Sequence, residues 1–441
     1  MEKKGSALII GGGVAGIQAS LDLADRGLAV YLVEKTPSIG GRMAQLDKTF
    51  PTLDCSICIL APKMIEVSRQ PNVKILTNSE VQEVSGEAGK FHVKVLKKAR
   101  FVDENKCVGC GICATKCPIK CPDEFNMGLS ERRAIYVPFA QAVPRIYTID
   151  RERCLYFTKG VCRICEKFCE AKAINFDLKD ETVELEVASI IVATGFDLYD
   201  PSVITEYGYR RYKNVLIALE FERMVSSTGP TSGKIIKLSD GGHPNTITFI
   251  QCVGSRSLSE GYPYCSSVCC MFATKEAILV KEHEPKIDVH IFYTDLMVFG
   301  KGFQEFVNRA SREWRIKYFP STKPGEIRED PKTRKLFFRY ENKDGEIKEF
   351  ETDLVVLCNA LTPRSDSRKL ADTLGVEVDE YGFFKTPNPP AAPVETTRHG
   401  IFVCGCCQEP MDIPDAVTRA SSAAAKASEI VTSAVLKEVF K

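Results

Sequence analysis

No stretch of 18 apolar residues occurs in this chain of 441 residues, so a membrane-spanning helix is not expected. Neither charge sign is in excess, because 59 Lys and Arg residues nearly balance 58 Asp and Glu residues. This balance excludes the broad basic surface that binds nucleic acid. Histidine is scarce, and its five scattered residues fit no metal-ligand or triad spacing. The remaining expectation is a cytoplasmic chain with room for two or three domains.

Cysteine is plentiful, with 19 residues, and eight of them form two quartets before residue 170. The first quartet is spaced C-x2-C-x2-C-x3-C and is followed by proline, and the second is spaced C-x7-C-x2-C-x3-C. In a reducing cytosol such groups indicate metal binding rather than a disulfide framework. The first spacing favours [4Fe–4S] clusters over zinc knuckles, for which four tetrahedral thiolates would suffice.

The two-cluster ferredoxins provide a template for dividing these ligands, because the last cysteine of each motif crosses to the other cluster. Three thiolates from one short loop can wrap one face of a cube, and the longer gap in the second quartet is acceptable as a loop. One cluster is therefore expected on Cys107, Cys110, Cys113 and Cys169, and the other on Cys154, Cys162, Cys165 and Cys117.

The N-terminal residues have the pattern of a dinucleotide-binding unit. Strands are expected at 7–10 and 28–33, with a helix at 15–25 between them and an acidic residue, Glu34, after the second strand. Gly11 permits the tight turn, Gly13 lets the backbone approach a pyrophosphate, and Gly16 lets helix and strand pack closely. The helix N-terminus, at Val14 and Ala15, offers free N–H groups to the phosphates, and Glu34 is expected to bind the adenosine ribose.

Later segments favour FAD over NAD. The loop Gly40-Gly41-Arg42 resembles the loop of the glutathione reductase superfamily that closes over FAD, and Arg42 would neutralise pyrophosphate charge. The segment 400–405 resembles the strand leading to the flavin ring, and a helix beginning near Ile413 would point its N-terminus at the flavin pyrimidine carbonyl. Further expected FAD contacts are Lys35, Gly41, Val81, Ala193, Thr194, Gly195, Gly405 and Ala416.

The sequence predicts the α/β class, in a glutathione/thioredoxin reductase-like FAD fold with two dinucleotide-domain units and an inserted bacterial-type 2[4Fe–4S] ferredoxin domain. After the strand expected at 246–250, the loop reads Gln-Cys-Val-Gly-Ser-Arg instead of GxGxxG, so no NAD(P) site is expected. The expected FAD-domain segments are 1–100, 181–230 and 395–441, with the ferredoxin domain at 101–180 and the second unit at 231–394.

A third group of cysteines lies where the superfamily usually binds NAD(P). Its members are Cys252, Cys265, Cys269 and Cys270, within 19 residues. The spacing alone leaves open whether these thiols are cluster ligands or small buried apolar side chains. No role is predicted for Cys121, Cys404, Cys406 and Cys407.

These features together resemble the heterodisulfide reductase A-subunit family, as do the segments 50–58, 122–129, 141–144 and 412–415. The resemblance implies a third [4Fe–4S] cluster on the cysteines from Cys252 to Cys270, beside FAD, and about 12 irons in all. It also implies that Lys275 lies near the flavin N5, where a cation would stabilise the reduced anionic flavin and could supply a proton. The alternative for Lys275 is an ordinary solvated helix lysine.

The resemblance implies an oxidoreductase of anaerobic metabolism: an electron-transfer subunit that splits flavin electron pairs into single electrons and bifurcates them in some complexes. Its expected partners are the other subunits, electron-carrier proteins and a second copy of the chain. Many family members continue with another two-cluster ferredoxin domain, so a short form is expected.

An alternative function is a disulfide reductase with Cys55 and Cys58 as its redox dithiol, because a reactive cysteine pair follows the Gly-Gly loop at a similar distance in glutathione reductase relatives. The same pair could instead ligate a further cluster shared with other segments. A third possibility is a non-enzymatic scaffold that keeps its cofactors only for stability.

Overall fold

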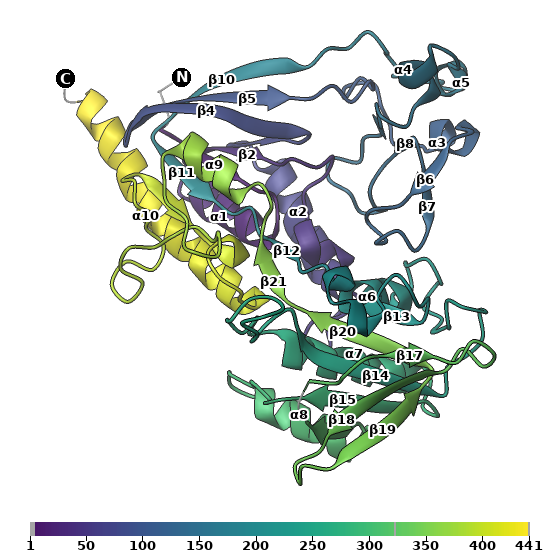
Figure 1. Ribbon diagram of the computed structural model, residues 1–441. Coiled ribbons are helices and arrows are strands. Elements are labelled where there is room, and N and C mark those ends of the chain that lie inside the picture. The colour runs from purple at the N-terminus through teal and green to yellow at the C-terminus, as the bar shows by residue number, and fades with distance from the viewer. Residues whose placement is uncertain (1–4, 322, 440–441) are drawn as a thin grey trace.

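Two parallel five-stranded sheets form the cores of two units in the computed structural model, which describes residues 5–321 and 323–439 (Figure 1). The first unit contains both chain ends. Its strands, in spatial order, are β22 (Ile401–Val403), β11 (Ser189–Val192), β1 (Ser6–Ile10), β2 (Ala29–Val33) and β3 (Val73–Leu76).

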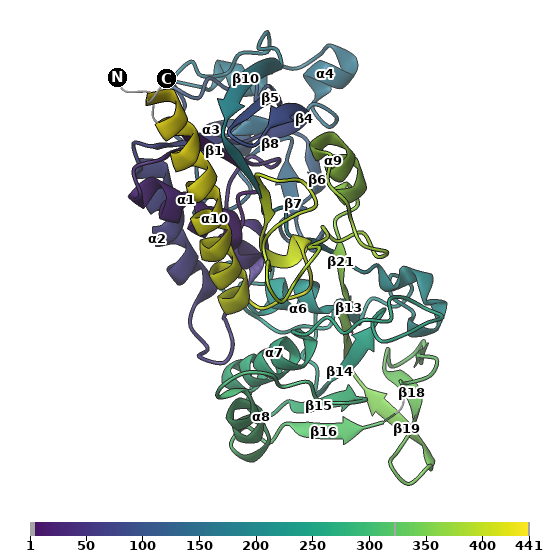
Figure 2. The same ribbon diagram turned by 90° about the vertical axis from the view of Figure 1, so that its left-hand side faces the viewer.

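Both faces of the first sheet are covered. On one face lie the helices α1 (Val14–Asp25), α2 (Ser56–Arg69) and α10 (Ile413–Val439), with α10 packed along α1 (Figure 2). On the other face lies an antiparallel sheet of β10 (Glu181–Val187), β5 (Lys90–Lys97) and β4 (Ser79–Glu87). Because strand side chains alternate, Ala7 and Ile9 pack toward the helices while Leu8 and Ile10 pack toward β5.

The predicted βαβ unit is confirmed, since β1, α1 and β2 match the expected ranges to within one residue at each end. The central strand β1 is apolar from Ala7 to Ile10, where it is buried on both faces, as is usual in parallel sheets.

The second unit repeats the parallel architecture. Its sheet comprises β13 (Val215–Ile217), β20 (Leu354–Asn359), β14 (Thr246–Val253), β15 (Asp288–Tyr293) and β16 (Lys317–Pro320). It is covered by α6 (Ala218–Val225), α7 (Cys269–His283) and α8 (Phe303–Arg312), and by an antiparallel sheet of β17 (Arg328–Glu329), β18 (Leu336–Glu341) and β19 (Ile347–Thr352).

The chain passes between the units through an antiparallel pair, β12 (Phe196–Leu198) and β21 (Leu361–Pro363). This position differs from the expected boundaries at 230 and 394. The strand β13 belongs to the second sheet and helix α6 packs on that sheet, whereas α9 (Ser367–Leu374) packs against β4 of the first unit. The pattern of apolar residues in 215–225 does not indicate which of the two sheets this segment joins. We therefore propose boundaries near residues 199 and 361.

The cysteine-rich segment lies between β5 and β10, which are antiparallel neighbours, so the chain leaves and re-enters the first unit at almost the same point. The segment contains short elements around a small core of its own, centred on Phe101 and Phe176. These elements are α3 (Ile112–Lys116), β6 (Lys120–Pro122), β7 (Glu131–Arg133), β8 (Ile135–Tyr136), β9 (Thr148–Ile149), α4 (Leu155–Lys159) and α5 (Ile164–Lys167). Across the described residues, no helix has both the length and the apolarity needed to cross a membrane.

Candidate functional site: a flavin cradle and three cysteine clusters

The glycine loop forms an open cradle at the N-terminus of α1. Gly13 is the N-cap residue, and neither a capping side chain nor a first-turn acid occupies the N–H groups of the helix. A Cβ on Gly13 would meet only the Cα of Gly41, at 3.9 Å. By contrast, a Cβ on Gly11 would come within 2.3 Å of the Ala193 carbonyl, and one on Gly16 within 1.8 Å of the Gly11 carbonyl. The free N–H groups and the open space at Gly13 fit a bound pyrophosphate.

Residues predicted to contact FAD from distant segments meet beside this cradle. Gly405 has a φ of +73°, and a Cβ there would lie 3.0 Å from the Cβ of Ala15 and 4.0 Å from that of Ala416. The predicted helix start at Ile413 is confirmed, since α10 begins there. Gly195, which follows β11, also has a left-handed φ of +75°, with no neighbouring atom within 4 Å of an added Cβ. The N-termini of α1 and α10 thus lie close together, next to the turn that follows β11.

The charged residues predicted to bind FAD make local contacts. Glu34 accepts hydrogen bonds from the N–H of Gly12 at 2.7 Å and the N–H of Thr36 at 2.8 Å, which hold its carboxylate at the cradle. Burial lowers the pKa of Arg42, and Asp197, 3.8 Å away, opposes this shift. An anionic pyrophosphate would give Arg42 a stronger partner.

Two other predicted FAD contacts are less closely tied to the cradle. Lys35 is half-exposed and pairs with Asp366 at 2.8 Å, while Val81 lies on β4, opposite Val95.

Replacing Gly13 with alanine is expected to weaken FAD binding at least about tenfold, or about 1.4 kcal/mol, because the new methyl group enters the space proposed for the pyrophosphate. Its backbone φ of −76° suits alanine, so the flavin-free protein should melt at the wild-type temperature. Fluorescence titration of the flavin-free protein with FAD gives the affinity. Gly325→Ala, at a remote glycine, is the control. Equal FAD affinity of the Gly13 variant and the wild type would contradict the cradle assignment.

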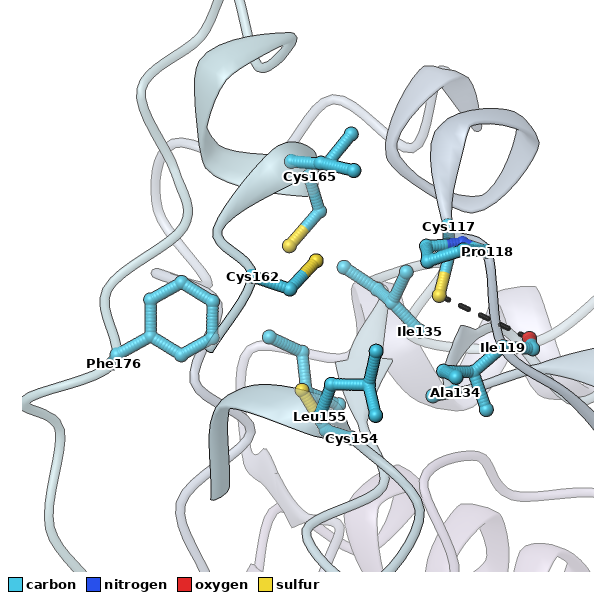
Figure 3. Close-up of a pocket in the computed structure, with 12 residues that line it drawn as sticks. Cys117, Pro118, Ile119, Ala134, Ile135, Cys154, Leu155, Cys162, Cys165 and Phe176 are labelled. Atoms are coloured by element: carbon cyan, nitrogen blue, oxygen red, sulfur yellow. Dashed lines mark hydrogen bonds between the residues drawn. The ribbon is translucent and has the colours of Figure 1, made fainter. Parts of the chain in front are cut away.

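Eight of the nine cysteines of the inserted segment, all except Cys121, lie around two hollows, each of about 350 Å³ including space open to solvent. One is lined by Cys117, Cys154, Cys162 and Cys165, whose sulfur atoms surround the cavity in Figure 3. The other is lined by Cys107, Cys110, Cys113 and Cys169. The structure therefore brings together the two crossed sets expected from the ferredoxin template.

The chemistry of the two sets suits clusters. The pKa of both Cys113 and Cys165 is raised to about 12, mainly by burial and in part by the neighbouring thiols. Within 5–321 and 323–439, no three Cys, His, Asp or Glu side chains converge as the ligands of one metal ion do. In a cubane each thiolate binds its own iron, so four sulfurs surrounding a hollow fit a [4Fe–4S] cluster.

The four cysteines of the third group come together near the C-terminal end of β14 in the second sheet. Cys252 is the penultimate residue of β14 and has a φ of +61°, Cys265 lies in the following loop, and Cys269 and Cys270 begin α7. Burial raises the pKa of Cys269 well above its usual value, and Cys252, Cys270 and Cys265 each raise it further, so the four thiols are neighbours.

Polar groups around this third group suit an anionic cluster. Arg256 and Lys323 both lower the pKa of Cys252 against the larger effect of burial. The buried hydroxyl of Ser255 has no hydrogen-bond partner among the described atoms, which leaves it free to donate to sulfur. Neither cation was predicted from the sequence, although Ser255 and Arg256 directly follow the strand. Cys358, fully buried on β20, lies behind the same thiols and was also missed.

Lys275 is fully buried on α7 and forms an ion pair at 2.5 Å with Glu222, which is equally buried on α6. The other oxygen of Glu222 accepts the N–H of Asp47 at 2.7 Å. Burial and then the Glu222 carboxylate raise the pKa of Asp47. The Glu222–Lys275 pair therefore lies against the segment that follows Gly41 and Arg42, although Lys275 belongs to the second unit. The solvated-lysine alternative is wrong, and sequence reasoning missed Glu222.

Cys55 and Cys58 form a disulfide at the start of α2, and the Cys55 sulfur accepts the N–H of Cys58 at 3.3 Å. Two cysteines near the end of the chain, Cys406 and Cys407, instead donate hydrogen bonds to backbone carbonyls. Cys406 donates to Met411 at 3.3 Å, and Cys407 donates to Cys404 at 3.2 Å. The Cys407 thiol packs inside the first unit beside the turn at Thr194 and Gly195.

Comparison with known families agrees with this architecture. The FAD dependent oxidoreductase family matches residues 7–52, the 4Fe-4S binding domain family matches 100–123, and the pyridine nucleotide-disulphide oxidoreductase family matches 267–424. These matches support FAD and iron–sulfur binding. Thioredoxin reductases from Lactococcus lactis and T. acidophilum share the fold, with TM-scores of 0.53 and 0.51 over 98% and 96% of this chain and 100% and 97% of theirs. At 17% and 15% identity, these structures confirm the fold class alone.

The curated relatives are much more similar. The iron-sulfur A-subunit of CoB–CoM heterodisulfide reductase from Methanocaldococcus jannaschii is 53% identical over 96% of this chain. The A-subunit of the H2:CoB-CoM heterodisulfide,ferredoxin reductase from Methanothermobacter thermautotrophicus is 48% identical over 96%. The chain belongs to the heterodisulfide reductase A-subunit family. It spans 64% and 63% of the length of these two relatives.

Proposed function

We propose that this chain is an FAD- and iron–sulfur-containing oxidoreductase subunit. It exchanges electrons in pairs at the flavin and passes them singly, through its clusters, to or from one-electron carriers. One observation carries the proposal. Within one chain, an open flavin cradle, two crossed cysteine hollows and a third buried cysteine group occur together. FAD, when bound, accepts two electrons together and releases them singly, whereas each cluster carries one. The proposed complement is one FAD and three [4Fe–4S] clusters.

Each part of the chain has a task in this proposal. The cradle residues would bind the pyrophosphate and ribose of FAD, and the N-terminus of α10 would face the flavin ring. The ammonium of Lys275, held by Glu222, provides a positive charge and a proton for the reduced flavin. The thiolates of Cys252, Cys265, Cys269 and Cys270 hold the cluster nearest the flavin, with Arg256 and Lys323 offsetting their charge.

Partners and location belong to the proposal as well. The relatives are named as subunits of heterodisulfide reductases, so we infer further subunits and carrier proteins for this chain. We also infer that the chain forms a homodimer, lies in the cytoplasm, does not bind NAD(P) and bifurcates electrons at the flavin. Bifurcation requires crossed flavin potentials, which a spectroelectrochemical titration of the flavin measures.

The proposal is tested by reducing the flavin of the anaerobic holoprotein with light and following flavin and cluster absorbance together. The expected result is that the flavin loses electrons while the clusters gain an equal number. A flavin that stays reduced beside oxidised clusters would contradict the proposal, and so would clusters that a physiological donor cannot reduce reversibly.

The observed disulfide favours a second candidate, a disulfide reductase that uses Cys55 and Cys58. Replacing both with serine separates the two functions. Because neither cysteine belongs to the three cysteine groups, we expect flavin-to-cluster electron transfer at the wild-type rate in Cys55→Ser/Cys58→Ser. Stopped-flow absorbance gives that rate, with Cys121→Ser as a control cysteine. A loss of transfer confined to the double variant would instead support the dithiol.

A further inference from the structure

Two glutamates are buried in contact with each other, between the predicted flavin site and the third cysteine group. Glu276 on α7 is 2% exposed, and Glu222 on α6 is 1% exposed. Their carboxyl groups are hydrogen-bonded to each other, which requires that one of the two carries a proton. Because two negative charges in contact in the interior repel each other strongly, the pair holds one proton and one negative charge.

The surroundings determine which glutamate carries the proton at rest. Glu222 accepts from the ammonium of Lys275 at 2.5 Å and from the N–H of Asp47 at 2.7 Å, and its charge also acts on the buried guanidinium of Arg223. By contrast, Oε2 of Glu276 has no hydrogen-bond partner among the described atoms. The pKa of Glu276 is raised well above its usual value, mainly by burial and in part by Glu222, while Lys275 opposes the shift. The negative charge therefore lies on Glu222, and the proton lies on Glu276.

The two glutamates face different redox sites. Through Asp47, Glu222 lies against the segment that follows Arg42 of the predicted flavin cradle. Glu276 lies beside Cys358 on β20, since it is the largest cause after burial of the raised pKa of that thiol, followed by cysteines of the third group. The carboxyl pair thus extends from the flavin side of the junction to the side of the third cysteine group.

We infer that Glu222 and Glu276 form a proton switch between the flavin and the third cluster. This inference rests on the proposed function. When negative charge is added at the flavin, the O–H bond of Glu276 breaks and an O–H bond forms on Glu222, so the negative charge of the pair moves to Glu276. When an electron then reaches the third cluster, the negative charge beside Glu276 returns the proton to it. The pair keeps its net charge throughout, and no proton is exchanged with solvent.

The switch has a physical advantage in a buried site. Charges inside a protein are weakly screened, so moving a negative charge from Glu222 to Glu276 stabilises an electron added on the side of Glu222. The same movement releases the ammonium of Lys275 from its carboxylate partner, which leaves that ammonium free to face the flavin. The flavin should therefore be easier to reduce than it would be beside a fixed Glu222 carboxylate.

Glu276→Gln tests this movement separately from the packing of the side chain. Glutamine has a similar size, is uncharged like the protonated acid and can donate to Glu222, but it cannot give up a proton. The variant is expected to melt and to bind FAD as the wild type does. Its flavin redox equilibrium should nevertheless shift toward the oxidised form at least about tenfold, which equals about 30 mV for a two-electron couple. A merely structural role of Glu276 would leave the flavin potential unchanged.

Infrared difference spectra of the photoreduced holoprotein detect the proton itself. In the wild type, one protonated-carboxyl band should disappear and another should appear when the flavin is reduced, and both should move when the glutamate carboxyls are labelled with ¹³C. The label separates them from the carbonyl bands of the flavin. Both bands should be absent from Glu276→Gln and present in Glu305→Gln, the control at an exposed glutamate of α8.

The inference is overturned if the labelled wild type shows no carboxyl bands on flavin reduction, or if Glu276→Gln keeps these bands or the wild-type flavin potential. The labelled wild type alone decides the question if Glu276→Gln does not fold. Visible absorbance follows electron transfer from the flavin to the clusters in the same samples. Failure of that transfer in the wild type would contradict the proposed function, whereas normal transfer without carboxyl bands would contradict only the proton switch.

Discussion

Replacing Cys265 with alanine is expected to lower the iron content by about four atoms per chain, from about 12 to about eight, while FAD and the two ferredoxin-type clusters remain. The reason is that a cubane lacking one of its four thiolates is poorly held, and Cys265 contributes its sulfur from a loop. It is half-buried, and its sulfur accepts the N–H of Ser267 at 3.4 Å. Removing this side chain therefore disturbs the core less than removing the fully buried Cys269 would.

Cys358→Ser is the matched control, because that thiol lies close to the same group but is not a predicted ligand. It should retain about 12 irons. Iron and sulfide assays, with EPR of the reduced proteins, give both results. An unchanged iron content in Cys265→Ala, or an equal loss in Cys358→Ser, would remove the third cluster from the account.

Replacing Lys275 with methionine is expected to have two separable effects. Because Glu222 would be left as an unpaired buried carboxylate, the protein should lose about 3–5 kcal/mol of stability. Because the positive charge that we propose beside the flavin would be lost, the flavin midpoint potential should fall by about 30–60 mV, which corresponds to about 1.4–2.8 kcal/mol for a two-electron couple. Thermal unfolding and spectroelectrochemistry measure the two effects independently.

The double variant Lys275→Met/Glu222→Gln distinguishes a structural role from a redox one. It removes both charges, so most of the lost stability should return, while the flavin potential should stay low. Lys281→Met is the control on the same helix. Its ammonium donates to the backbone carbonyls of Pro285 and Ile287, so the variant should lose stability and leave the potential unchanged. Recovery of the wild-type potential in the double variant would place Lys275 away from the flavin.

The parts of the structure that could be predicted depend on short-range spacing. A glycine loop between two strands requires particular residues at particular offsets, so Gly11, Gly13 and Gly16 were identified together. The ferredoxin template likewise specifies which cysteine crosses over, and the structure brings Cys169 to the hollow of Cys107 and Cys117 to the hollow of Cys154. Within the glycine loop and within each cysteine motif, local geometry constrains residues that are close in sequence, and the ferredoxin template supplies the crossing between the two motifs.

The parts that could not be predicted depend on contacts between distant segments. Glu222 lies on a short helix that follows an apolar strand, and nothing near it in sequence shows that α6 packs against α7. The same holds for Lys323, which reaches Cys252 from another part of the second unit. The boundaries that we propose differ from the expected ones for a similar reason, because β13 joins its sheet and α9 packs on β4 through tertiary contacts that a linear pattern does not record.

The cofactor content of the chain is measured by quantifying iron, sulfide and FAD on anaerobically purified protein, with EPR through a redox titration. We expect one FAD and about 12 irons per chain, with three cluster signals that titrate separately. About eight irons would contradict the assignment of Cys252, Cys265, Cys269 and Cys270 to a third cluster. The absence of FAD from a protein that retains its clusters would contradict the flavin-linked electron transfer itself.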